Sequence, residues 1–549
     1  MRKEIFFKYA IYGLVIALVV GVVFNTFIRN DKPENMINNT EIRYEKSTEV
    51  MLSMDPAETL NPIVSTDEDV FYLSKLLYSG LFKTDRFMTP RMDLASDYDF
   101  SGDRLSLSLK NAKFHNGDTV DGEDVEFTVK AIKAAGEKCV YYNKIKKIKD
   151  VSGSGKNVTI TFEDESYMNL ADLDFPIVPK DEYGRVSVFL KDTENFKPVG
   201  TGMYKYSSYD KTKALKLTGF DRYFDGKAEN TVTVNVLKKG SNKVKMTESG
   251  NITVLLDKTE GRDTKINKKG IEIYNFPGNY VEFVGFNFNN KLIANKNIRK
   301  AICYAIDVEN IIEEDYYNKL SQSNTFYMPG YLDVNDQKTE YVFDLDKAGV
   351  LLDKQGLTED DEGYLVDKDG KRFTLTLVVN KNYGERADAA ERIEDDLESL
   401  GIDVTVKEYE TYDGYKQALK NGNFDIYIGG MKIDNSMDFR SVLKSDGEFN
   451  FGKFKDSKSD KYLNALYSGK TVSESAEVLT NYKDYLGDTV PYYCFGYKTF
   501  GIIKSDVFKG DLAASFTNPY NNIDQWHCEY QVRIEQEDEE SSESSESEE

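Results

Sequence analysis

Apolar and polar residues alternate over Leu105–Leu109, where a serine separates each leucine from the next. This period of two predicts a half-buried strand. Other strand-like runs occur at Val158–Phe162, Thr374–Val379 and Val404–Val406. Before the last of them, Arg386–Leu400 has a helical pattern that Gly401 would end. Strands that alternate with helices predict an α/β fold with mainly parallel sheets.

The chain after Leu109 contains a turn and then a helix start. Residues 113–118 read Lys-Phe-His-Asn-Gly-Asp, and Gly117 can adopt the positive φ that other residues resist. Asp121 is a predicted helix N-cap, with Asp124 three positions later in a capping-box arrangement. The stretch therefore predicts a strand, a tight turn and a capped helix in direct succession.

Residues 109–127 also resemble the signature of the family 5 extracellular solute-binding proteins, which feed oligopeptides, dipeptides or nickel chelates to ABC importers. Further segments are similar to motifs of the same family and follow in the same order: Thr59–Pro62, Leu77–Phe82, Leu94–Tyr98, Pro198–Tyr204, Ile298–Asp307 and Asp344–Gly356. The likeness covers roughly residues 47–530, most of the chain.

The resemblance implies a type II periplasmic-binding-protein fold, with two hinged lobes and an extra inserted domain. The implied layout is lobe I at 47–81, 198–285 and 490–532, the inserted domain at 82–197, and lobe II at 286–489. Crossing strands would join the lobes, and closure of the lobes around a ligand is the mechanism that the family implies.

The N-terminus predicts a membrane anchor. Tyr9–Ile28 is mostly apolar and long enough to span a hydrocarbon core as a helix. Arg2, Lys3 and Lys8 precede it, so the positive-inside rule places residues 1–29 as a cytoplasmic stub with a single-pass signal-anchor. Residues 30–46 would be a tether to an extracytoplasmic bulk. A cleaved signal peptide is the alternative, although no small-x-small cleavage site follows the apolar run.

The net charge of the chain limits the kinds of molecule that it can bind. The net charge is −23 and no basic stripe is visible, which argues against a nucleic-acid partner. Residues 535–549 carry nine acids and no bases, and we expect 533–549 to form an acidic disordered tail. A contact of this tail with calcium or a cationic wall is the alternative.

The reactive residue types do not form a catalytic or metal-binding pattern. The four cysteines are too far apart for a zinc site of familiar spacing, which leaves a Cys494–Cys528 disulfide or buried free thiols. His115 fits a turn-stabilising role, and Ser152–Lys156 fits a hairpin turn better than a phosphate loop. We therefore expect no enzyme activity, no metal and no cofactor.

A ligand site is predicted from the resemblance. A peptide's cationic amine is costly to desolvate unless a fixed carboxylate pairs with it. In the family this carboxylate comes from a Gly-Trp-x-x-Asp-Tyr motif, which is similar to residues 430–435 here, after a strand at 424–428. Asp434 is then the candidate amine partner, with Met431 and Asn435 in place of the tryptophan and the tyrosine. An ordinary surface aspartate is the alternative.

The expected function is a cell-membrane-anchored, extracytoplasmic and monomeric solute receptor. It would capture a small solute, most simply a peptide, by lobe closure and deliver it to an ABC permease. Three alternatives stay open at this point: a sensor of the same fold that signals to a membrane partner, an exported enzyme, and a wall-adhesion protein.

Overall fold

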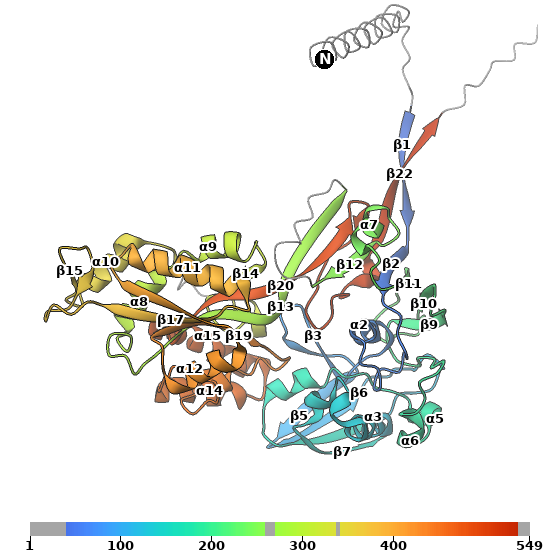
Figure 1. The fold of residues 1–549 in the computed structure, drawn as a ribbon. Coiled ribbons are helices and arrows are strands. Elements are labelled where there is room, and N and C mark those ends of the chain that lie inside the picture. Colours follow the sequence, from blue (N-terminus) through green and yellow to red (C-terminus); the bar gives the residue numbers. More distant parts are fainter. Residues whose placement is uncertain (1–39, 259–269, 336–340, 536–549) are drawn as a thin grey trace, which may run out of the picture. The chain divides into compact units, whose positions relative to one another are not determined.

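The computed structural model describes residues 40–258, 270–335 and 341–535, and it contains two compact units. One comprises residues 1–46 and 529–549, and the other comprises residues 47–528. In the smaller unit, strand β1 (Thr40–Ser47) pairs with β22 (His527–Glu535) (Figure 1).

A four-stranded sheet with the order β2-β11-β10-β9 lies within residues 47–81 and 198–285, two of the ranges predicted for lobe I. Its strands are β2 (Glu49–Met54), β9 (Tyr204–Tyr209), β10 (Ala214–Gly219) and β11 (Thr231–Val236). Exposed or half-buried residues alternate with buried ones along β2 and β11, so one face of the sheet packs on the core. Helix α2 (Glu68–Leu77) contacts the sheet at β9.

The inserted domain contains a four-stranded antiparallel sheet with the order β5-β6-β8-β7. Its strands are β5 (Ala95–Ser101), β6 (Arg104–Leu109), β7 (Ile148–Ser154) and β8 (Asn157–Phe162). The predicted strand at 105–109 is confirmed, and its three leucines are buried. The predicted hairpin turn at Ser152–Lys156 is confirmed: residues 152–154 end β7, and Gly155 and Lys156 make the turn to β8.

The helix after the signature turn, α3 (Gly122–Ala135), starts with the predicted capping box. The Glu123 amide donates to Asp121 Oδ1 at 2.8 Å, and the Asp121 amide donates to Asp124 Oδ2 at 2.9 Å. Gly122 is required because its backbone lies directly against Gly153 of β7, where an added Cβ would come within 2.7 Å. The helix is thereby fixed on the sheet of the inserted domain.

His115 stabilises the turn before α3, in agreement with the sequence. Its Nδ1 accepts from the Gly200 amide at 3.2 Å, and its Nε2 lies 3.1 Å from the Gly202 carbonyl oxygen. This geometry requires the neutral imidazole with the proton on Nε2, because Nδ1 must accept. Burial accordingly lowers the pKa of His115 to about 4.

A specific pH dependence of stability follows from this neutral histidine. An unfolded histidine binds a proton near pH 6.5, whereas the folded one resists protonation down to about pH 4. Stability is therefore lost as the pH falls through this window. Between about pH 7 and about pH 4.5, the unfolding free energy of the wild type should fall by about 2 kcal/mol more than that of His115→Asn. Equal losses in urea titrations of the two proteins would contradict this assignment.

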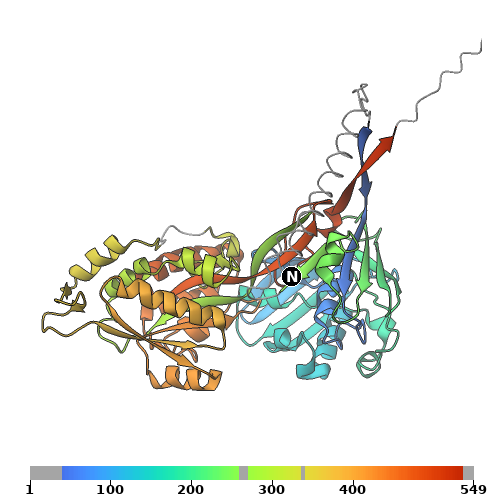
Figure 2. The same cartoon turned by 45° about the horizontal axis from the view of Figure 1, so that its top comes forward.

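The largest sheet runs through lobe I and lobe II in the order β12-β20-β13-β19-β17-β18, and β14 pairs with β20 (Figures 1 and 2). Its strands are β12 (Val254–Asp257), β13 (Ile271–Phe286), β14 (Leu320–Gln322), β17 (Thr374–Asn380), β18 (Asp403–Tyr409), β19 (Ile426–Lys432) and β20 (Tyr492–Ser505). The β13–β20 register shifts between Pro277 and Val281 and again between Glu282 and Phe283. Such irregularities bend a strand pair, so β13 and β20 bend at these positions.

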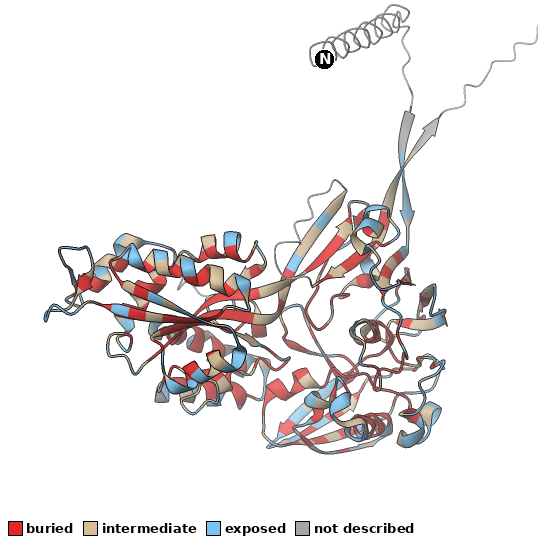
Figure 3. Cartoon of the chain, in the orientation of Figure 1, coloured by how far each residue is buried: buried red, intermediate tan, exposed pale blue. Residues whose placement is uncertain are grey.

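Helices of lobe II cover this sheet (Figure 3). Those at 296–305, 345–353 and 384–398 enclose a second core of buried residues, whereas those at 412–421, 457–467 and 472–489 pack into the main core. The longer helices are α8 (Lys296–Ala305), α10 (Leu345–Asp353), α11 (Gly384–Glu398), α12 (Tyr412–Asn421), α14 (Ser457–Tyr467) and α15 (Val472–Thr489). The predicted helix at 386–400 corresponds to α11, and Gly401 follows it with a φ of 77°. The strands predicted on either side of it are β17 and β18.

Short elements connect these layers. The strands are β3 (Phe82–Thr84), β4 (Pro90–Met92), β15 (Thr358–Glu359), β16 (Leu365–Val366) and β21 (Phe508–Lys509). The helices are α4 (Tyr142–Ile145), α5 (Lys180–Tyr183), α6 (Val186–Phe189), α7 (Lys243–Glu248), α9 (Val308–Asn310) and α13 (Arg440–Leu443). Single helical turns are η1 (Gly136–Lys138), η2 (Tyr167–Asp172), η4 (Ile311–Asp315), η5 (Tyr331–Asp333) and η6 (Ile523–Gln525).

The prediction of sheet direction needs correction, and the prediction of domain boundaries stays open. The prediction of mainly parallel sheets is wrong: among the strand pairs with a described register, only β2–β11, β17–β18 and β17–β19 are parallel. Tight connections such as that between β7 and β8 permit only antiparallel pairing. The domain boundaries stay a prediction.

The cysteines are free and buried, so the open alternative of buried thiols holds and the Cys494–Cys528 disulfide does not form. Cys494 lies on β20 opposite Phe283 of β13, whereas Cys528 Sγ lies 3.7 Å from Thr253 Oγ1. The two thiols therefore have different neighbours.

The predicted anchor at 9–28 and the acidic stretch at 536–549 lie outside the described residues. Within residues 40–258, 270–335 and 341–535, none of the helices has the length and apolar character needed to span a bilayer.

Candidate functional site

The predicted ligand motif lies where the two lobes share a sheet. Strand β19 continues to Lys432, so Gly430 and Met431 are part of the strand, whereas the sequence placed them after a strand at 424–428. The extension follows from pairing with β13, in which Gly430 lies opposite Glu282 and Met431 lies opposite Val281. Met431 is half-buried there. The motif thus starts beside the bend of the long strands.

A buried ion pair lies beneath this end of β19. Arg386 of α11 donates from Nε and Nη2 to the Glu282 carboxylate at 2.7 and 2.9 Å, and Glu282 is fully buried. The hydroxyl of Tyr316 donates to the same carboxylate at 3.2 Å. Burial alone would lower the pKa of Arg386, but Glu282 holds it well above its ordinary value. Arg386 therefore stays charged inside the protein.

The same ion pair explains the glycine of the motif. A Cβ atom on Gly430 would lie 2.1 Å from Arg386 Nη2 and 2.8 Å from Glu282 Oε1. Any side chain at this position would displace the guanidinium from the carboxylate. Gly430 is therefore required by the buried charges under the strand, whatever the ligand is.

Two tyrosines and a lysine surround the outer side of Arg386. Its guanidinium lies 4.3 Å from the ring centroid of Tyr383 and 5.7 Å from that of Tyr280. Lys498 of β20 places its Nζ 6.0 and 5.9 Å from the same two rings. Sequence reasoning missed this cluster because its members come from 280, 383, 386 and 498, and only the sheet brings them together.

A further cation comes from lobe I. Lys258 follows β12, and its Nζ lies 4.3 Å from the Tyr72 ring centroid and contacts the Glu68 carboxylate. Burial lowers the pKa of Lys258, and the charge of Lys432 at the end of β19 lowers it further. Because this influence acts between lobes, Lys258 lies within electrostatic range of the predicted motif.

Asp434 is exposed at the end of the motif. Its Oδ1 accepts from the Ser436 amide at 3.1 Å and from the Ser436 hydroxyl at 2.7 Å. Its Oδ2 accepts no hydrogen bond from the described residues. The carboxylate is thus held by one oxygen and accessible to a donor at the other.

Asn435 is buried, and its amide points to the inserted domain. Its Nδ2 donates to Asp174 Oδ2 at 3.1 Å and lies 3.4 Å from the carbonyl oxygen of Ala171. The residue after the candidate amine partner is therefore in contact with the inserted domain, and this contact fixes the start of the loop that follows β19.

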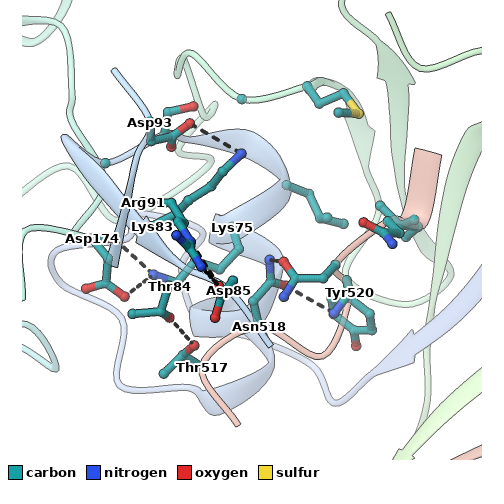
Figure 4. Close-up of a pocket in the computed structure, with 18 of the residues that line it drawn as sticks. Lys75, Lys83, Thr84, Asp85, Arg91, Asp93, Asp174, Thr517, Asn518 and Tyr520 are labelled. Carbon is teal, nitrogen blue, oxygen red and sulfur yellow. Dashed lines mark hydrogen bonds and ion pairs between the residues drawn. The ribbon is translucent and has the colours of Figure 1, made fainter. Parts of the chain in front are cut away.

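Asp174 connects three parts of the chain, and Figure 4 shows its contact with Lys75. Lys75 of α2 donates to its carboxylate at 2.9 Å, Lys144 of α4 pairs with the other carboxylate oxygen, and Asn435 comes from lobe II. Burial alone would raise the pKa of Asp174, but Lys144 and Lys75 hold it at about 2. The carboxylate is therefore ionised at neutral pH.

The described part of the chain is predicted to hold few reactive side chains in common clusters. It contains no group of three or more His, Cys, Asp or Glu residues that could hold a metal ion. His115 is engaged with the backbone at Gly200 and Gly202, and His527 is the first residue of β22.

Two α/β lobes connected by long bent strands, with an inserted domain, define the type II periplasmic-binding-protein class. A family model, described as bacterial extracellular solute-binding proteins, family 5 middle, matches residues 89–451. The chain belongs to this family, whose members are extracytoplasmic receptors for solutes.

Named relatives agree with this assignment. The oligopeptide-binding protein AppA of Bacillus subtilis is 24% identical over 455 residues, which cover 79% of this chain and 82% of the relative. The nickel-binding protein NikA of Staphylococcus aureus is 24% identical over 408 residues, 72% of this chain and 78% of the relative. The crystal structure of a peptide-binding protein AppA from Clostridium difficile superposes with a TM-score of 0.63 at 18% identity, covering 87% of this chain and 99% of that one.

Proposed function

We propose that the protein is a membrane-tethered receptor that captures a short peptide between lobe I and lobe II and delivers it to an ABC permease. Family membership supports a solute receptor, and the name of the Bacillus subtilis relative supports a peptide. The apolar run at 9–28 supports the tether. The observation that carries the choice of peptide is the Asp434 carboxylate, which has one accessible oxygen at the sheet shared by the lobes.

A peptide presents a cationic amine at one end and a carboxylate at the other, and both are costly to desolvate without a partner. Asp434 offers an anion for the amine. Lys258, Lys432 and Lys498 offer cations near the bend of β13 and β20, and Tyr280 and Tyr383 offer large surfaces with polar tips. In this proposal Met431 lines the site and Asn435 positions Asp434 through its bond to Asp174.

Closure of the two lobes requires a place where the strands that join them can bend. The register shifts between Pro277 and Phe283 provide it, because they interrupt the β13–β20 ladder beyond the part of β20 that pairs with β12, within and next to the part that pairs with β14. A ligand that contacts both lobes would then stabilise the closed arrangement over the open one.

The test is the substitution Asp434→Asn, which keeps the shape of the side chain and removes its charge. We expect it to weaken binding of a free-amine peptide at least tenfold, which is about 1.4 kcal/mol. Isothermal titration calorimetry on a peptide selected from a random tetrapeptide pool measures this change. Asp361→Asn, which alters an exposed aspartate of lobe II outside the site, is the matched control.

A modification of the peptide makes the test specific for its amine. Acetylation of the peptide's amine should weaken binding to the wild type by a similar factor and have little effect on Asp434→Asn. Unchanged affinity in Asp434→Asn, or an equal loss on acetylation in both proteins, would remove Asp434 from the proposal.

A further inference from the structure

The loop that carries Asp434 contains a strained residue. Residues 434–437 form a turn, which the Met437 amide closes by donating to the Asp434 carbonyl oxygen at 3.3 Å. Met437 is fully buried and has a φ of 50°, in the left-handed region that favours glycine. Such a conformation persists only where neighbouring groups hold it, and strained residues of this kind cluster at ligand sites. The turn therefore needs a group that fixes Met437.

Tyr467, the last residue of α14, supplies that group. Its side chain is buried, and its hydroxyl donates to the Met437 carbonyl oxygen and accepts from the Phe439 amide at 3.1 Å. The hydroxyl of Tyr327 lies 3.3 Å from the same oxygen and must be the donor there, because Tyr467 has only one hydroxyl proton. The Tyr467 hydroxyl thus makes three hydrogen bonds, which fix its position and orientation.

Other contacts hold the neighbours of Met437 in the loop. The Tyr331 hydroxyl donates to the Ser436 carbonyl oxygen at 3.4 Å. Arg440 donates from Nε and Nη2 to the Asp438 carboxylate at 3.0 and 2.6 Å. In the described part of the chain, no side chain other than Tyr467 bonds the backbone of Met437. The strained residue itself therefore depends on the Tyr467 hydroxyl.

A short series of hydrogen bonds connects this hydroxyl with Asp434. Tyr467 holds the carbonyl group of Met437, and the amide of Met437 holds the backbone of Asp434. The turn between them carries Ser436, whose amide and hydroxyl bind Asp434 Oδ1 at 3.1 and 2.7 Å. The accessible Oδ2 is thereby held in place by the protein alone. A group that is ordered in advance binds its ligand without the entropy cost of ordering.

We propose that Tyr467 is a positioning residue of the amine site, whose hydroxyl holds the strained turn in the form that directs Asp434 to the amine of the ligand. This inference rests on the proposed peptide site. Without the hydroxyl, two backbone groups inside the protein lose a partner and Met437 can relax to an ordinary φ. The fraction of molecules with Asp434 in place then falls, and the apparent affinity falls by the same factor.

The substitution Tyr467→Phe tests this role, because it removes the hydroxyl and keeps the ring. The probes are a free-amine tetrapeptide selected from the random pool and the same peptide with its amine acetylated. By isothermal titration calorimetry, the variant should bind the free-amine form about tenfold more weakly than the wild type does. Its affinity for the acetylated form should change little, because that peptide does not use Asp434.

Tyr482→Phe is the matched control. Tyr482 is a fully buried tyrosine of α15, and its hydroxyl lies 2.8 Å from Ser459 Oγ. Its replacement removes a buried hydroxyl of the same lobe that makes no bond to residues 434–439. Urea unfolding should show a loss of stability similar to that of Tyr467→Phe, whereas both peptide affinities should stay at the wild-type values.

A double variant separates positioning from a general effect on the fold. Tyr467→Phe combined with Asp434→Asn should bind the free-amine peptide no more weakly than Asp434→Asn alone, because a residue that acts through Asp434 adds nothing once its charge is gone. Additive losses, equal losses for the two peptide forms, an equal loss in Tyr482→Phe, or an unchanged affinity in Tyr467→Phe would each overturn the positioning role. If instead neither Asp434→Asn nor acetylation alters affinity, the proposed peptide site itself fails, and the positioning role falls with it.

Hydrogen exchange of the wild type tests the same inference without any variant. The amides of Met437 and Phe439 are both hydrogen-bonded in the absence of a ligand. We therefore expect slow exchange in residues 434–439 of the ligand-free protein and little further slowing when the free-amine tetrapeptide binds. Fast exchange that becomes slow only with the peptide would mean that the ligand orders the loop, and it would overturn the proposal.

Discussion

Replacing Arg386 with methionine is expected to lower the free energy of unfolding by about 3–5 kcal/mol. The methionine has a similar length, but it leaves the fully buried Glu282 carboxylate without the two hydrogen bonds at 2.7 and 2.9 Å. An uncompensated buried charge is much more costly than the loss of an ion pair as a whole. Urea unfolding of the variant and the wild type measures the difference.

The double variant Glu282→Leu with Arg386→Met separates the two effects. It removes both charges, so it should recover a large part of the stability that Arg386→Met loses. Arg372→Met is the matched control, because Arg372 pairs with Asp360 and Glu362 near the surface of the same lobe, and it should change stability little. A small loss in Arg386→Met, comparable with that of Arg372→Met, would contradict the assignment of a buried ion pair.

The second large effect is expected for Asp174→Asn, at about 2–4 kcal/mol of unfolding free energy. Lys75 and Lys144, whose side chains are each 13% exposed, would lose the anion that they share. The folded pKa of Asp174 is about 2, below the ordinary 3.8, so its contribution is present above about pH 3.8 and is lost as the pH falls towards 2. Urea unfolding at neutral pH measures the loss.

A comparison with Asp181→Asn tests whether the location of the charge matters. Asp181 is exposed on α5 of the same inserted domain, and its replacement should leave stability almost unchanged. If the two variants unfold at the same urea concentration, the three-part junction at Asp174 does not hold the domains together.

Local structure could be predicted from the sequence where neighbouring residues determine it. The capping box at Asp121, the strand at Leu105–Leu109 and the end of α11 at Gly401 depend on residues within a few positions. The pairing direction of the sheets depends on connections between distant segments, and there the expectation of mainly parallel strands was wrong.

The candidate site likewise combines residues that the sequence could identify with contacts that it could not. The sequence identified residues 430–435, and the structure places them beside the bend of β13 and β20. It could not show that Glu282 and Arg386, 104 positions apart, form the base under Gly430. Nor could it show that the Asn435 amide reaches Asp174, 261 positions away. Such contacts are set by the packing of whole elements, for which a single sequence carries no local signal.

Small-angle X-ray scattering of the full-length protein with and without a saturating free-amine peptide tests the central claim most directly. If lobe I and lobe II close around the peptide, the radius of gyration of the wild type should fall on binding. Asp434→Asn at the same peptide concentration should keep the ligand-free value. A peptide that binds to the wild type by calorimetry and leaves its radius of gyration unchanged would contradict capture by closure.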